Sequence, residues 1–120
     1  MKIKNKDLAN VINFLDGVKA KGLKSIHRTR ITNKLKSKFE ELGEAQKQLQ
    51  DEFKNDKENY LDEMKKLLDE HVTIDDTDSK VYIESLKSLI KDVLDDEEQE
   101  FNDGDALGLE VVYTALEMEW

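Results

Sequence analysis

Apolar residues recur every three or four positions along most of the chain, which is the spacing of amphipathic helices. The first such segment covers residues 5–16, with Asn5 as its expected N-cap and Gly17 as its expected stop. Two later segments, at about 79–95 and 106–118, have apolar residues on a wide face or on two faces. Helices of that kind are buried inside a domain or against a partner.

A longer apolar series begins near Ser25 and advances in alternating steps of four and three residues, the rhythm of helices that pack side by side. A wholly polar stretch at 54–59 interrupts it, and a second amphipathic segment covers 58–71. Two arrangements stay open: a helical hairpin, or one continuous helix of about 45 residues. The series is also the candidate protein-binding seam, unless it packs only on the chain's own helices. The seam consists of Phe39, Leu42, Leu49, Phe53, Tyr60 and Met64.

The segments between the expected helices are short and polar. Residues 72–78 are expected to be a connector, in which Val72–Ile74 is too short to be assigned as a strand and Thr77 or Asp78 caps the next helix. Residues 95–105 are expected to be an acidic turn. The whole chain of 120 residues therefore predicts a single all-α domain of about five helices, including a long charged helix or a helical hairpin.

Charge is distributed unevenly along the chain. The charged fraction is 39% against 38% hydrophobic residues, and the net charge is −9. Residues 1–38 contain eleven lysines and arginines and two acids, whereas residues 39–120 contain eight lysines and 26 acids. Such a division favours head-to-tail contact, either within the chain or between copies in a homo-oligomer.

The basic half contains a run of cations that is the candidate basic patch. No aromatic residue lies between the cations, and the chain as a whole has a pI of about 4.7, which argues against nucleic-acid binding. We expect the patch to contact an acidic protein surface instead, including the acidic half of another copy. The patch consists of Lys19, Lys21, Lys24, Arg28, Arg30 and Lys34.

No residue pattern predicts catalysis, a cofactor or a metal ion. The chain has no cysteine, and its two histidines, His27 and His71, lie apart from any recognisable set of ligands. The acidic segments do not fit the ligand spacing of an EF-hand in any register, and no nucleotide-binding or nucleophile motif is present. We therefore expect a protein that is not an enzyme and that binds another protein. No run of apolar residues approaches the length of a membrane span.

Both ends of the chain resemble a family of small helical proteins from siphophages of Gram-positive bacteria, of the lactococcal and streptococcal type. The resemblance rests on the first 35 residues, on the closing segment ALGLEVVYTALEMEW and on a basic run after the first helix. The matching residues of that run are Gly22, Lys24, Ser25, Arg28, Thr29 and Arg30.

The resemblance implies a non-structural tail-assembly chaperone in the host bacterial cytoplasm. Such a protein is expected to bind the hydrophobic helices of the tape-measure protein, by analogy with a lactococcal phage chaperone. Two alternatives stay open: an anti-defence or regulatory protein that acts through its acidic surface, motivated by residues 95–105, and a structural component of the tail or connector.

Overall fold

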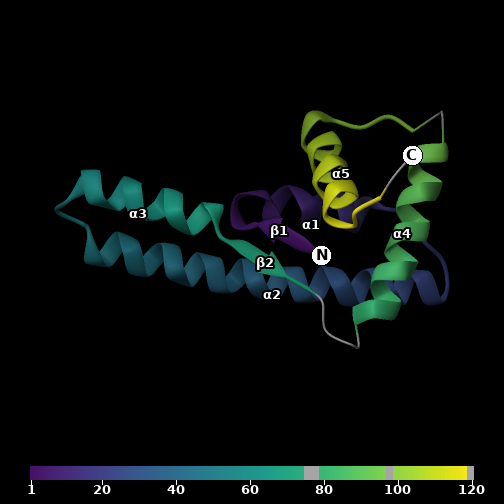
Figure 1. The fold of residues 1–120 in the computed structure, drawn as a ribbon, viewed down its shortest axis with the longest axis horizontal. Helices are drawn as coiled ribbons and strands as arrows, with labels where there is room; N and C mark the ends of the chain where they lie inside the picture. Colours follow the sequence, from purple (N-terminus) through teal and green to yellow (C-terminus); the bar gives the residue numbers. More distant parts are fainter. Residues whose placement is uncertain (75–78, 97–98, 119–120) are drawn as a thin grey trace.

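The computed structural model describes residues 1–74, 79–96 and 99–118. Within them it shows an all-α protein with one small antiparallel sheet (Figure 1). The predicted fold class and the prediction of about five helices are confirmed. The elements, in order, are β1 (Lys2–Lys4), a 3-10 turn (Asn5–Asp7), α1 (Leu8–Gly17), α2 (Leu23–Glu52), α3 (Lys57–Asp69), β2 (His71–Thr73), α4 (Ser79–Asp95) and α5 (Asp103–Ala115).

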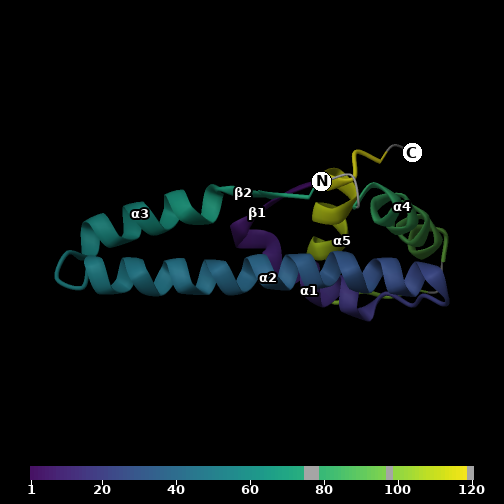
Figure 2. The same ribbon diagram turned by 90° about the horizontal axis from the view of Figure 1, so that it is seen from below.

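The long apolar series forms a helical hairpin, so the alternative of one continuous helix is wrong. Helix α2 runs without interruption for 30 residues and ends at Glu52. A tight turn follows, and α3 begins after Asp56, whose side chain accepts a hydrogen bond from the backbone N–H of Asn59 (3.2 Å). Figures 1 and 2 both show α3 lying along the distal half of α2. We call this pair, from Phe39 to Asp69, the arm.

The two short strands were missed by the helical interpretation of the sequence. Lys2, Ile3 and Lys4 pair antiparallel with Thr73, Val72 and His71, so part of the expected connector at 72–78 is a strand. Ile3 and Ile74 are buried, which explains why such short strands persist. Residues 75–78, which include the expected caps Thr77 and Asp78, lie outside the described residues.

Asn5 is not the N-cap of the first helix, contrary to the prediction. Its side-chain amide donates to the Leu67 carbonyl (2.9 Å), and its backbone N–H donates to the Glu70 carbonyl (2.8 Å). Asn5 therefore fastens β1 to the end of α3. Helix α1 begins three residues later than expected, at Leu8, after Asp7, which makes no side-chain capping bond.

The core lies where α1 packs between α5 and α2, and where α4 packs across the first half of α2. Helix α4 has the predicted bounds. Helix α5 approaches α1 closely at Gly108, where an added Cβ would lie 2.5 Å from the Asn10 carbonyl oxygen and 2.7 Å from the Cβ of Phe14. The side chains that are fully buried in this core include Leu8, Val11, Leu15, Ile31, Leu35, Leu86, Ile90 and Val112.

Helix α5 covers Asp103–Ala115 and not the predicted 106–118. The reason is a cap that hydrophobic spacing cannot reveal: the Asn102 side chain accepts a hydrogen bond from the backbone N–H of Asp105 (2.7 Å). Asp103 and Asp105 then lie in the first turn, where negative charge stabilises the helix.

Replacing Asn102 with alanine should lower the free energy of unfolding by about 1 kcal/mol, because the cap bond to the N-terminus of α5 is lost. Urea unfolding followed by circular dichroism measures the change. Asn13, exposed within α1, supplies the matched control, and its alanine variant should differ from the parent by less than about 0.5 kcal/mol. Equal effects for the two variants would contradict the capping role.

The molecule is longer than a compact domain of this size because the arm projects from the core (Figure 2). Its extents are 50 × 31 × 22 Å and its radius of gyration is 16.1 Å. A compact chain of 120 residues would have a radius of gyration of about 14 Å. The architecture therefore has two parts, a core and an arm, and α2 belongs to both.

Candidate functional site

The candidate seam follows the arm, but its residues differ in how far they are buried. Leu42, near the base of the arm, is 6% exposed and belongs to the chain's own core. Phe39 is 45% exposed, whereas Leu49, Phe53, Tyr60 and Met64 are half-buried between α2 and α3. The structure thus brings most of the seam together along one helix pair, and it leaves every seam side chain except that of Leu42 partly uncovered.

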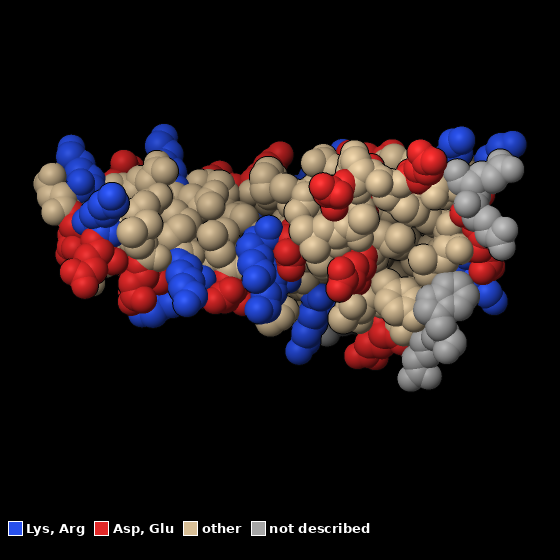
Figure 3. All heavy atoms as spheres, turned by 90° about the horizontal axis from the view of Figure 1, so that it is seen from above, with Lys and Arg blue, Asp and Glu red and all other residues tan. Residues whose placement is uncertain are grey.

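Helix α3 buries none of its thirteen residues completely. Its apolar residues Tyr60, Met64, Leu67 and Leu68 face α2 only in part, and Leu61 is 55% exposed. Figure 3 shows a broad uncharged area on this face of the arm, with lysines and acids along its borders. Two helices alone cannot enclose an apolar seam from all sides, so the remaining area is open to another element.

The tip of the arm has a shallow hollow of about 410 Å³. Phe53 and Tyr60 supply its aromatic lining, and Lys54 and Lys57 border it. Aromatic side chains in such hollows are common anchors at protein interfaces, because they bury a large apolar area and lose little conformational freedom.

Ion pairs cover the outer side of α3. Lys66 Nζ lies 3.2 Å from Glu63 Oε1 and 3.5 Å from Asp62 Oδ2. The hydrogen bond with Glu63 and the negative charges of Glu63 and Asp62 raise the pKa of Lys66 above its ordinary value. These groups are exposed, so they keep this side of α3 hydrated.

Most residues of the basic patch bond to other parts of the same chain. Three of its six residues, together with His27, bond to a row of hydroxyl groups spaced three residues apart on α4, and Arg30 also lies over the Tyr82 ring, 5.3 Å from its centroid. This regular spacing is the signal that sequence reasoning passed over. The pairs are Lys24 with Ser88 (2.7 Å), His27 with Ser85 (2.5 Å), Arg30 with Tyr82 (3.0 Å) and Lys34 with Ser79 (2.7 Å).

The other three basic residues do not form one surface with these. Arg28 donates a hydrogen bond to the Val18 carbonyl and so holds the connector between α1 and α2 against α2. Lys19 borders a hollow near α4, and Lys21 is exposed in the connector between α1 and α2. The candidate basic patch is therefore divided among an interhelical contact, a loop contact and solvent.

The acidic segment adjoins a hollow of about 210 Å³ between α1, α4 and the start of α5. Phe14 and Phe101 form part of its lining, with ring centroids 6.2 Å apart. The acids at its border are Asp92, Asp96, Glu100 and Asp105. Glu97 and Glu98 of the same segment lie outside the described residues.

Within residues 1–74, 79–96 and 99–118, no group of three or more histidines or acids is placed to hold a metal ion. No helix in this part of the chain is long and apolar enough to cross a membrane. Comparison with known proteins gives no match to a family model, a curated protein or a solved structure.

Proposed function

We propose that this protein is a non-enzymatic chaperone that binds amphipathic helices of another protein along its arm. The observation that carries the proposal is the incomplete burial of the seam: α3 has no fully buried residue although its apolar residues recur at helical spacing. A third helix laid against α2 and α3 would cover Phe53, Tyr60 and Met64 and complete a three-helix bundle. Helix-in-groove binding of this kind uses apolar anchors at helical spacing.

The chemistry of the arm suits a client that would otherwise aggregate. The seam takes up the apolar face of a client helix, and the ion pairs around Lys66 keep the outer side hydrated. Binding removes free client from the pool that aggregates, by mass action. No catalytic group is needed for this activity.

The client we propose is the tape-measure protein of a siphophage, bound in the host bacterial cytoplasm before the tail tube closes around it. This step rests on the family resemblance of residues 1–35 and of the closing segment. The long hydrophobic helices expected of such a client match an arm that presents an elongated apolar seam. Self-association is not required, because Lys24, Arg30 and Lys34 already have partners on α4.

Co-expression with the phage's tape-measure protein tests the proposal. The client should be soluble and co-purify with the wild-type protein, whereas the double variant Phe53→Ala/Tyr60→Ala should bind at least about 30-fold more weakly, as expected when interface anchors are lost. Val81→Ser is the matched control, because Val81 is apolar and 60% exposed but lies on α4, outside the arm. Circular dichroism checks that both variants remain helical.

Two results would contradict the proposal. One is a client that stays insoluble in the presence of wild-type protein. The other is full binding by the double variant, which would place the interface away from the arm. Finding the protein in mature virions would instead favour a structural tail component, and loss of a host partner after Asp95→Lys and Asp96→Lys would favour the anti-defence alternative.

A further inference from the structure

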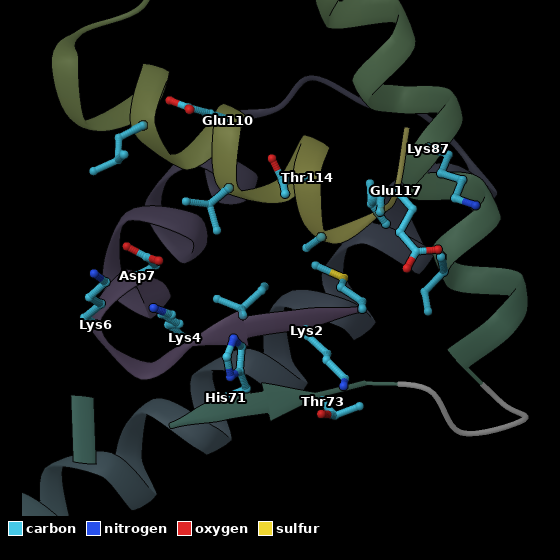
Figure 4. Close-up of a pocket in the computed structure, with 17 residues that line it drawn as sticks. Lys2, Lys4, Lys6, Asp7, His71, Thr73, Lys87, Glu110, Thr114 and Glu117 are labelled. Atoms are coloured by element: carbon cyan, nitrogen blue, oxygen red, sulfur yellow. The ribbon is translucent and has the colours of Figure 1, made fainter. Parts of the chain in front are cut away.

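Two hollows of the molecule differ in how charge is distributed around them. A groove of about 710 Å³ lies between β1 and α5 (Figure 4). Figure 4 shows Lys4, Lys6 and Asp7 on the sheet side of this groove, and Glu110 on α5 across from them. Opposite charges in one lining balance, so this groove favours neither an acidic nor a basic ligand. The hollow at the tip of the arm has charge of one sign only.

The tip hollow combines aromatic rings with positive charge. The residues that line it are Gln50, Phe53, Lys54, Lys57 and Tyr60, two of them basic and none acidic. Among the described residues, no carboxylate lies within ion-pair distance of Lys54 or Lys57. Lys66, on the outer side of α3, pairs with two acids instead. The positive charge at the tip therefore has no direct partner in the described chain.

An uncharged strip continues from the tip hollow along the same side of the arm. Steps of four, three and four residues place one set of α3 residues on this side, namely Lys57, Leu61, Met64 and Leu68. Gln46 of α2 shares it, because its Nε2 lies 3.7 Å from Met64 Sδ. Lys65 is exposed one turn beyond Leu61, at the border of the strip. Figure 3 shows basic side chains on both long borders of this uncharged area. A helix laid on the strip would therefore have lysines on its flanks.

Acidic residues outnumber lysines in the arm as a whole, but none of them lines the tip hollow. Asp56, the nearest in sequence, accepts hydrogen bonds from the backbone N–H and the side chain of Asn59 (3.2 and 2.5 Å). Glu52 accepts a hydrogen bond from Gln48 on its own helix (2.8 Å). Exposed charges more than about 8 Å apart are largely screened at physiological ionic strength. A helix seated on the strip therefore interacts with the nearby lysines more strongly than with the net charge of the arm.

We propose that the arm selects client helices that carry acidic residues beside their apolar face. The apolar residues of such a helix would lie on Phe53, Tyr60 and the strip, and its carboxylates would lie next to Lys54, Lys57 and Lys65. Charges at the rim of an interface set the choice of partner, because like charges brought together there are unfavourable. This inference rests on the proposed function, since it specifies the chemistry of the client that the arm binds.

Fluorescence anisotropy with the full chain tests the selection, using three labelled peptides that share one leucine face and differ only in flanking charge. Each consists of three heptads, acidic (Leu-Gln-Gln-Leu-Glu-Ala-Glu), neutral (Leu-Gln-Gln-Leu-Gln-Ala-Gln) or basic (Leu-Gln-Gln-Leu-Lys-Ala-Lys). The acidic peptide should bind about 5- to 10-fold more tightly than the neutral one, because three exposed charge contacts each contribute a factor of about 2. The basic peptide should bind more weakly than the neutral one. Raising the salt concentration from about 50 mM to about 0.5 M should remove most of the preference.

Charge reversal at the tip assigns the preference to particular residues. The variant Lys54→Glu/Lys57→Glu should bind the basic peptide more tightly than the acidic one. The matched control is Lys80→Glu/Lys91→Glu, which changes the net charge equally at exposed positions of α4, outside the arm, and should keep the acidic preference. Circular dichroism checks that both variants remain helical. An acidic preference that survives Lys54→Glu/Lys57→Glu would overturn the assignment to the tip.

The remaining outcomes separate this inference from the proposed function. Equal binding of the three peptides, weakened by Phe53→Ala/Tyr60→Ala, would overturn the charge selection and leave the arm as the binding site. Binding of none of them would count against both. Sedimentation velocity tests whether a second copy occupies the strip instead. A dimer that dissociates in Phe53→Ala/Tyr60→Ala would make that copy the occupant and overturn the inference.

Discussion

Replacing Gly108 with alanine is expected to destabilise the protein by about 3 kcal/mol and to lower its melting temperature by roughly 10 °C. The added Cβ would lie 2.5 Å from the Asn10 carbonyl oxygen, and backbone cannot yield as the end of a side chain can. The change must push α5 away from α1, where the two helices form much of the core. The higher helix propensity of alanine, about 1 kcal/mol, recovers only part of this loss.

Gly43 provides the matched control, because it lies inside α2 with no atom near the position of an added Cβ. Gly43→Ala should therefore raise the free energy of unfolding by about 0.5–1 kcal/mol. Thermal and urea unfolding of both variants measure the two effects. If the two glycine variants shifted stability in the same direction, the close approach of α5 to α1 would be refuted.

The second large effect is expected at Leu35, which is fully buried in α2 where the helix crosses the core. Leu35→Ala should lower the free energy of unfolding by about 2–5 kcal/mol, because it removes buried methyl groups and leaves a cavity. Leu49 lies fourteen residues later on the same helix and is half-buried in the arm. Its alanine variant should lower the free energy of unfolding by about 1 kcal/mol.

Hydrogen exchange distinguishes the two leucine variants further. Leu49→Ala should speed exchange in α3 and the distal part of α2 while α1 and α5 stay protected, since a region with little buried apolar area opens locally. Leu35→Ala should speed exchange throughout the core. Similar losses of stability from both variants would mean that the arm is packed as tightly as the core.

The helices were largely predictable because their signals are local. Apolar spacing around Leu86 and Ile90 gave the bounds of α4, and the polar stretch after Phe53 marked the hairpin as one of two possibilities. The strands were not predictable in the same way, because Ile3 and Val72 meet only after α1, α2 and α3 have placed them together. In the sequence, β1 is marked only by three residues that alternate lysine, isoleucine and lysine.

The candidate sites were harder to predict than the helices, because their geometry depends on tertiary contacts. The seam from Phe39 to Met64 could be read from the spacing, but the burial of Leu42 and the exposure of Leu61 are set by where α3 lies. The basic run appeared to be one surface because its cations are close in sequence. Its division follows from α4, whose hydroxyl groups meet Lys24, Arg30 and Lys34 at positions about 45 to 64 residues away.

The continuity of α2 makes the reach of the arm adjustable. Helix α3 contacts α2 and the 3-10 turn at Asn5–Asp7, while α2 is anchored in the core through its first half. Seven residues added to α2 and seven to α3 would keep both apolar seams in phase and carry the tip about 10 Å further out. The length of surface offered to a client can therefore change without any substitution in the core.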